Sequence, residues 1–395
     1  MPKVGLKGGA VKNAIEMPKG MPKRIEEYDE LNVQELRIGM RHSAVISRDG
    51  QLYTYGSGNW GVLGHGNERD IRFDKPKRVE RFSKEEVVDI ALGEYHSLAL
   101  TADGNVWTWG YGGKAGYFNW MYAQEVGALG HGGIEPNFTP KKVQFFPENG
   151  LKVTHIAAGN THCAVLCDDG NLYNWGVGTY GILGNGNNDY ALTPIINEEF
   201  AYMKKEAEEA GTLHGFRKLD AANEFTAVVM EDGQLFVWGK NEWGQMGVGA
   251  GIGIDLVESE NLPSPVDIAP ALPSDAEDKV PFIIDVAAGM RTMMIRDAED
   301  RVLKTGLKID WSPKLVGLNP DRIEGKIKQM ACGRGHYALL DSKNQLHVFG
   351  KVLKEKAEEE HDGFGVYDGN DLFDEGEVLD LQMKYETFGA LVKNA

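Results

Sequence analysis

Histidine is the residue type whose spacing in this sequence most suggests chemistry, because its side chain titrates near neutral pH. Four histidines follow a glycine at the same distance, in the pattern Gly-x-x-His. Histidines with catalytic pKa values occur singly in clefts, whereas these recur along the chain. We therefore expect a structural role, in which the glycine permits a turn and the imidazole hydrogen-bonds backbone groups of neighbouring strands. The pairs are Gly39 and His42, Gly93 and His96, Gly159 and His162, and Gly333 and His336.

The three cysteines, Cys163, Cys167 and Cys332, are the next candidates for chemistry. A metal site that combines the first two with His162 is conceivable, but four ligands at a recognised spacing are missing. We expect core packing instead, and neither a metal nor a cofactor. An odd and sparse set of cysteines favours a reducing, intracellular compartment over a disulfide-linked secreted protein.

Two glycine-rich stretches, 56–61 and 176–181, match the dinucleotide-binding pattern Gly-x-Gly-x-x-Gly. That pattern holds a pyrophosphate only where it follows a strand and opens a helix. Gly64 and Gly66 follow the first stretch closely and prevent a helix, so we interpret the match as a false positive. No Ser/His/Asp, Cys/His or paired-carboxylate pattern stands out from the repeats, and we do not expect an enzyme.

The elements that carry these residues are short strands in a repeated unit. The clearest copy, 87–110, has three short apolar runs separated by a turn at 93–96 and by the hairpin pair Asp103-Gly104. Repeats of roughly 40–50 residues with several strands each are typical of β-propellers. The sequence predicts an all-β protein, a single seven-bladed β-propeller over 1–395 with four-stranded antiparallel blades and with loop and short helical insertions. The other copies begin near Val33, Val153, Phe216, Ile283, Ile327 and Val378.

The glycine-rich tail of each unit resembles a known family. A proline and an apolar residue follow the tail, as in Pro76 and Val79. Together with Gly-x-x-His and Asp-Gly, the tails resemble the regulator of chromosome condensation repeat family, whose members fold as seven-bladed propellers. Units five to seven lack the tail and are assigned by register. The tails lie at 56–66, 126–132, 176–186 and 239–247.

The formal net charge of −17 bears on the partners. Proteins that grip nucleic acid usually present a basic face, so we expect no direct binding of nucleic acid. No apolar run of about 18 residues occurs, and we expect no transmembrane helix. We expect the cytoplasm or a cytoplasmic assembly, with the mitochondrion as an alternative if the basic N-terminal segment, 1–21, is a targeting element.

The N-terminal segment has two other interpretations. It could contact an acidic partner, or it could belong to the fold. The repeat register begins at Pro22, and residues 3–8 align with a strand that the last unit lacks. We therefore expect residues 3–8 to pair antiparallel with a strand at 387–392 and to close the last blade.

An insertion at 113–125 is unusually aromatic for a loop in solvent. Aromatic residues and methionine are enriched in the cores of protein interfaces. We expect either a binding loop or a segment that folds back over a blade or plugs the mouth of the channel. Its candidate contact residues are Tyr117, Phe118, Trp120, Met121 and Tyr122.

Three further insertions lie at 198–215, 249–281 and 351–377. In the first, apolar residues at helical spacing over 198–210 and a stop signal at Gly211 predict a short helix on the rim. The second is rich in Gly, Pro, Asp and Glu and predicts a long surface loop. In the third, we expect a short exposed helix over 351–360 and an acidic loop over 362–377.

These observations favour a non-catalytic scaffold that binds other proteins through its loops, as a subunit or adaptor of a larger intracellular assembly. The resemblance implies an alternative, because the founding member of that family is a nucleotide exchange factor for a small nuclear GTPase and binds chromatin. The exchange residues cannot be placed on this sequence one by one. Recruitment to cytoskeletal or membrane-bound complexes is a third possibility that the sequence does not separate from the first.

Overall fold

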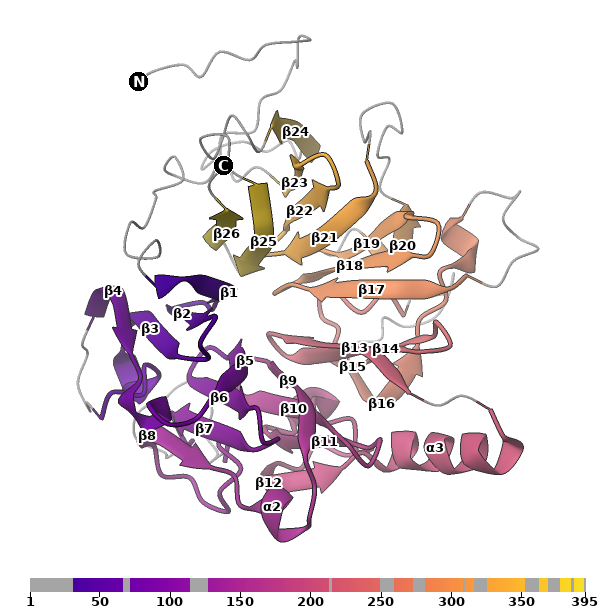
Figure 1. The fold of residues 1–395 in the computed structure, drawn as a ribbon. Helices are drawn as coiled ribbons and strands as arrows, with labels where there is room; N and C mark the ends of the chain where they lie inside the picture. Colours follow the sequence, from indigo (N-terminus) through magenta and orange to yellow (C-terminus); the bar gives the residue numbers. More distant parts are fainter. Residues whose placement is uncertain are drawn as a thin grey trace.

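The computed structural model describes residues 31–66, 72–113, 127–212, 215–248, 259–272, 281–307, 310–315, 325–351, 362–368, 377–384 and 387–393. Antiparallel sheets stand around a central channel, in sequence order, as Figure 1 shows. The innermost strand of each sheet lines this channel. The chain is therefore a β-propeller.

Six blades have four strands each, paired in chain order from the channel outward. The first three blades are β1 (Val33–Ile38), β2 (His42–Ser47), β3 (Leu52–Ser57) and β4 (Arg72–Arg78); β5 (Val87–Leu92), β6 (His96–Thr101), β7 (Val106–Gly110) and β8 (Asn137–Lys142); and β9 (Val153–Ala158), β10 (His162–Cys167), β11 (Leu172–Gly176) and β12 (Ala191–Ile196). The next three are β13 (Phe216–Ala222), β14 (Phe225–Met230), β15 (Leu235–Lys240) and β16 (Ser259–Pro265); β17 (Ile283–Ala288), β18 (Thr292–Asp297), β19 (Val302–Gly306) and β20 (Asp310–Leu315); and β21 (Ile327–Cys332), β22 (His336–Asp341), β23 (Gln345–Lys351) and β24 (Asp362–Asp368).

The seventh sheet differs from the prediction. Instead of four strands, the described residues form only β25 (Glu377–Lys384) and β26 (Thr387–Lys393), which lie between β21 and β1. Seven four-stranded blades are therefore wrong for the described chain, which has six and a two-stranded sheet. No further strand of this sheet lies among the described residues. The proposed closing strand, 3–8, lies outside the described residues.

Apolar faces of consecutive blades pack against one another to form the core. Between the first two blades, for example, Ile46 of β2 and Ile90 of β5 belong to one buried cluster with Phe82. Trp109, Trp175 and Trp238 occupy the same position in three third strands and are fully buried. Burial of such large side chains stabilises each blade against the next.

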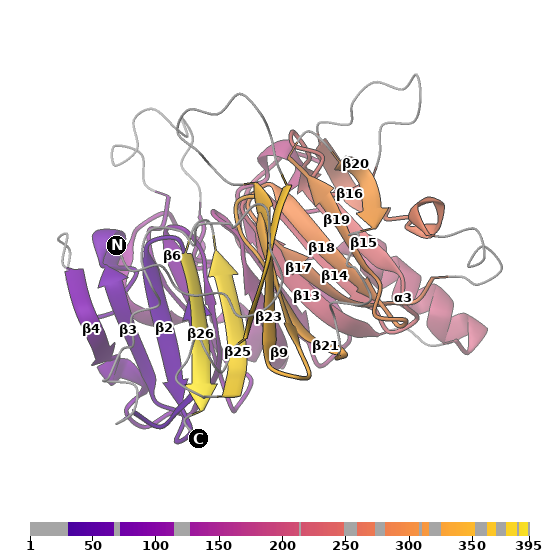
Figure 2. The ribbon, with the colours of Figure 1, turned by 90° about the horizontal axis from the view of Figure 1, so that it is seen from above.

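The helix predicted at 198–210 is α3 (Glu198–Ala210), with the same bounds. The side chain of Asn197 accepts a hydrogen bond from the Phe200 N–H, and Gly211 ends the helix in the left-handed conformation, with φ of 66°. Phe200 is buried in the core, while the helix projects from the rim (Figures 1 and 2). Met203 of the second turn also packs against this core, so the first two turns anchor the helix to the propeller.

Two predicted loops contain strands instead. The insertion 249–281 includes β16 and the short 3-10 helix η4 (Ala269–Ala271), and the acidic stretch 362–377 includes β24. Both strands are the outermost of their blades, where one side of the strand needs no partner and proline is tolerated. The helix expected within 351–360 falls almost wholly outside the described residues, and Lys351 itself belongs to β23. Among the helices described, none is long and apolar enough to cross a membrane.

Candidate functional site

The Gly-x-x-His segments are the turns that join the first two strands of a blade. In four of them the glycine N–H donates to the histidine carbonyl oxygen, at 2.9 to 3.0 Å. Each of three rings then reaches the following blade: His42 Nε2 lies 2.8 Å from Ser97 Oγ, and His162 Nε2 lies 2.9 Å from Thr226 Oγ1. His96 Nε2 lies 3.2 Å from Cys163 Sγ. The turns therefore connect neighbouring blades.

Burial keeps the imidazoles of His42 and His96 neutral. It lowers the pKa of His42 to about 3, with a smaller contribution from His96, and it lowers the pKa of His96 to about 4. Both side chains are almost completely buried, whereas His336 is half-buried. A substrate has no access to the buried rings, so they do not form a catalytic site.

The cysteines lie in the core. Cys332 Sγ lies 3.0 Å from Thr292 Oγ1, at the turn where threonine replaces the histidine. Burial raises the pKa of Cys163 well above its usual range, and it also raises the pKa of Cys167. The described residues contain no group of three or more His, Cys, Asp or Glu that could hold a metal ion.

The glycine-rich tails are turns, and neither dinucleotide-like stretch opens an α-helix within the described residues. Short 3-10 segments, η1 (Asn59–Gly61) and η3 (Thr179–Gly181), place Trp60 and Tyr180 in the left-handed conformation, with φ of 66° and 59°. The next blade holds the tail, because Trp109 Nε1 donates to the Val62 carbonyl at 2.7 Å. The dinucleotide match is therefore part of the propeller.

The sequence interpretation missed two histidines in these tails. His65 Nε2 lies 3.0 Å from Thr54 Oγ1, and His131 Nε2 lies 2.9 Å from Thr108 Oγ1. Burial lowers the pKa of each ring to about 4. The repeated Gly-His-Gly in the first two tails is the signal that could have identified them.

The turns and the tails lie at the same end of the blades, because each second strand starts opposite the end of the third, as in the pairing of His42 with Gly56. We call this end the loop face. Aromatic rings alternate there with cations: Arg291 Cζ lies 3.7 Å from the centre of the Trp243 ring, and Lys240 Nζ lies 4.5 Å from that of Tyr180. Tyr180 is 46% exposed.

The candidate interaction residues Tyr117, Phe118, Trp120, Met121 and Tyr122 lie outside the described residues. The described chain stops at Gly113, shortly after the end of β7, and resumes at Gly127 in the tail. Both flanks belong to the loop face, because β7 ends there and the tail holds the next blade through the bond from Trp175 Nε1 to the Ala128 carbonyl, 3.1 Å long.

The channel wall carries a ring of polar residues that the sequence interpretation also missed. Every innermost strand has a β-bulge, and a polar residue follows it in all seven. An apolar residue stands two positions before and one position after it in all seven strands, and this spacing is the signal that could have revealed the ring. The strands enclose a cavity of about 430 Å³. The ring consists of Glu35, Asp89, His155, Lys218, Asp285, Gln329 and Asp380; all but Glu35 line this cavity, and Glu35 lines an adjoining hollow.

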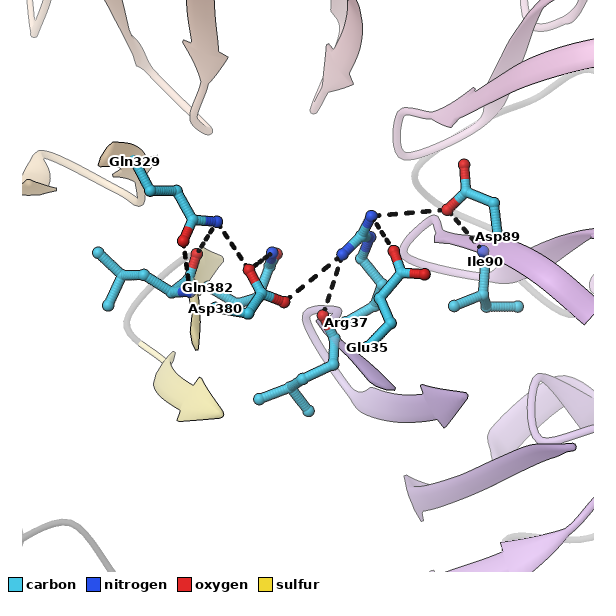
Figure 3. A network of polar contacts seen from close by, with 9 residues as sticks. Glu35, Arg37, Asp89, Ile90, Gln329, Asp380 and Gln382 are labelled. Carbon is cyan, nitrogen blue, oxygen red and sulfur yellow. Dashed lines mark hydrogen bonds and ion pairs between the residues drawn. The ribbon is translucent and has the colours of Figure 1, made fainter. Parts of the chain in front are cut away.

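One sector of the ring forms a continuous network (Figure 3). Arg37 of β1 contacts Glu35 on its own strand, and it lies 3.5 Å from Asp89 and 3.7 Å from Asp380. Gln329 Nε2 donates to Asp380 Oδ1 at 2.7 Å. Burial raises the pKa of Glu35 to about 7; Asp89 and Asp380 raise it further, while Arg37 lowers it.

Comparisons with known families place repeats on this chain. A model described as the regulator of chromosome condensation (RCC1) repeat matches residues 49–100, 123–166 and 232–295, and a second model with the same description matches 87–114.

The chain is also similar to curated proteins. It is 32% identical over 243 residues to the human E3 ubiquitin-protein ligase HERC2. This match covers 61% of this chain but only 4% of HERC2. It is 27% identical over 340 residues to the ultraviolet-B receptor UVR8 of Arabidopsis thaliana, covering 84% of this chain and 68% of UVR8. The chain thus spans a small fraction of the first relative and about two thirds of the second.

Two solved structures resemble the fold. Prp20p of Saccharomyces cerevisiae, described with its binding to Gsp1p and histones, superposes with a TM-score of 0.71 at 17% identity, covering 93% of this chain and 84% of that one. Human WBSCR16 gives a TM-score of 0.65 at 19% identity, covering 92% and 87%. At these identities the likeness concerns the fold alone.

Proposed function

The chain is a β-propeller of regulator of chromosome condensation repeats, and on this premise we propose that it is a non-catalytic scaffold that binds protein partners through its loop face. The observation that carries the proposal is that aromatic rings on that face lie beneath cations. Tyr180 with Lys240 and Trp243 with Arg291 are the clearest pairs.

Such pairs are suited to recognition. Aromatic residues and arginine dominate the binding energy of protein interfaces, and a cation over a ring gains strength when a partner excludes water. A left-handed conformation costs a non-glycine residue of the order of 1–3 kcal/mol, and the surrounding turns hold Tyr180 in it. The ring is therefore presented in one orientation, which lowers the entropy lost on binding.

The aromatic segment 113–125 belongs to the same proposal. Its flanks, Gly113 and Gly127, lie on the loop face, and Gly113 is two residues from Tyr111 in the sequence. Tyr111 is itself part of an aromatic group, since its ring centre lies 5.6 Å from that of Trp60. We propose that the segment extends this group toward the partner.

The test uses the full chain. Affinity capture followed by mass spectrometry identifies partners, and titration calorimetry then gives the dissociation constant of the identified partner. We expect Tyr180→Ser, and separately the combined change of Tyr117, Phe118, Trp120 and Tyr122 to Ser, to weaken binding by about tenfold or more with an unchanged melting temperature.

Tyr202→Ser is the matched control. Tyr202 is 57% exposed on α3, which follows the end of β12 that is remote from the loop face. The control should bind as the unmodified chain does. Unfolding of the quadruple variant would show that the segment belongs to the core, and loss of binding in the control alone would place the interface elsewhere.

The alternative function, nucleotide exchange on a small GTPase, rests on likeness of fold. A shared fold is weak support for a shared activity, and a net charge of −17 argues against binding to chromatin. We propose that the chain lacks this activity.

A further inference from the structure

The interface between the last sheet and the first blade, which we call the seam, differs from the other blade interfaces. Each of the six other interfaces contains an apolar cluster with members from both blades. At the seam, the cluster among the described residues belongs to the first blade alone and is built on Val33, Leu36, Ile38 and Val45. Among the side chains that the structure describes, which include only Ala390 of β26, the apolar cluster at the seam therefore comes from the first blade.

A polar cluster spans the seam instead. Arg37 of β1 reaches Asp380 of β25 on one side and Asp89 of β5 on the other. Gln329 of β21 fixes β25 in turn, because its Oε1 accepts from the Leu381 N–H at 2.7 Å. The seam cluster, defined as Glu35, Arg37, Asp89, Gln329 and Asp380, thus ties four innermost strands together (Figure 3).

The charges of the seam cluster do not balance. Glu35, Asp89 and Asp380 share one guanidinium, and the side chains of Glu35 and Asp380 are only 17% and 16% exposed. At the same ring position of the fifth blade, Asp285 lies 4.0 Å from Lys218 and 3.5 Å from Arg296, and Asp220 is close enough to raise its pKa. Two cations therefore serve the carboxylates there, whereas the seam cluster has one.

We infer that the seam cluster is a proton-operated clasp: it holds the last sheet to the first blade when Glu35 carries a proton, and it loosens when Glu35 ionises. With Glu35 neutral, Arg37 is shared by Asp89 and Asp380, one on each side. With Glu35 ionised, a third carboxylate competes for the same guanidinium and repels the other two.

The direction of the effect follows from linkage. Burial raises the pKa of Glu35 from its ordinary 4.5 to about 7, so the folded chain binds the proton more tightly than the unfolded chain. The resulting stabilisation is fully present below pH 4.5 and is lost as the pH rises through about 7. The charged groups that face Glu35 are Arg37, Asp89 and Asp380, and Lys328 lines the adjoining hollow.

The test is amide hydrogen exchange of the full chain at pH 6 and pH 8, expressed as protection factors so that intrinsic exchange cancels. We expect strands 33–38 and 378–383 to lose protection by about tenfold at pH 8, because one unit of pKa corresponds to a factor of ten. Strand 283–288 serves as the internal reference and should change little. Equal protection at both pH values in 33–38 and 378–383 of the unmodified chain would by itself overturn the inference.

Two substitutions sharpen the test. Glu35→Gln mimics the protonated side chain, and we expect it to keep the pH 6 protection at pH 8. Asp285→Asn, at the same ring position, should leave the pH dependence of the seam intact. If the Glu35→Gln chain retains the full pH dependence, the effect belongs to another group and the inference is wrong.

Discussion

At the scale of single residues, the Gly-x-x-His motif shows why the two residue types occur together. The sequence interpretation assigned the glycine to a turn, but Gly159 does not have positive φ. A Cβ at this position would lie only 2.0 Å from His162 Cε1, so the imidazole occupies the space of a side chain. The glycine is needed for close approach. Three of the rings have side-chain partners in the next blade, and backbone groups of Asn160 and His162 also hydrogen-bond the His96 ring, as expected.

This geometry predicts the effect of one methyl group. Gly159→Ala should lower the free energy of unfolding by about 1–3 kcal/mol, because the His162 ring must move and its bond to Thr226 is disturbed. Gly133→Ala is the control, since a Cβ there meets nothing within 4 Å and its φ is not positive. Urea denaturation of the two variants measures the difference. Equal stabilities would show that the ring adapts without cost.

At the scale of elements, the sequence predicts what local chemistry determines. Helix α3 was predictable to the residue because Asn197 and Gly211 mark its ends and Phe200 gives it an anchored face. The outermost strands β16 and β24 were missed because their sequences are rich in proline, glycine and acid. Such strands are held mainly by backbone bonds to one neighbour. Pro263 and Val266 do repeat the spacing of Pro76 and Val79, and this signal was available for β16.

The candidate site was less accessible to sequence reasoning than the fold. The ring of polar residues depends on seven bulges that aim one side chain of each innermost strand into the channel, and bulges are set by strand pairing rather than by local sequence. The network around Arg37 joins β1, β5 and β25, which are far apart in the sequence and meet only when the ring closes. The aromatic segment 113–125 could be named from composition alone, and its role remains a proposal.

The closing strand is a prediction at this scale. If residues 3–8 complete the last sheet, deletion of residues 1–10 should lower the melting temperature and speed amide exchange over 378–392, because an edge of β26 loses its partner. Calorimetry and hydrogen exchange measure both effects. Unlike Glu35→Gln, the deletion should leave the pH dependence of the seam in place. Wild-type stability of the deleted chain would exclude the closing strand.

At the scale of the whole molecule, a shared fold does not imply a shared activity. The chain shares its architecture with Prp20p across 93% of its length at 17% identity. A likeness of this kind concerns the fold, and the loops can still differ. We expect the purified chain to leave the rate of fluorescent-GDP release from small GTPases unchanged, because no matched exchange residues were found in the sequence. A large catalytic increase with a cognate GTPase would replace the scaffold proposal with an exchange factor.

The contacts between blades also have a direction. His42 of the first blade reaches Ser97 of the second, and the tail of the first blade accepts a hydrogen bond from Trp109 of the second. Contacts that join unlike surfaces head to tail close into a ring only if the rotation per unit completes a full circle; otherwise they propagate without end. The chain is in this sense a tethered cyclic oligomer, and the seam is the one junction that has no tether unless residues 3–8 close the last sheet. If that junction opened, its two surfaces would be complementary to those of a second chain, and the opened molecule would be the repeating subunit of a domain-swapped filament.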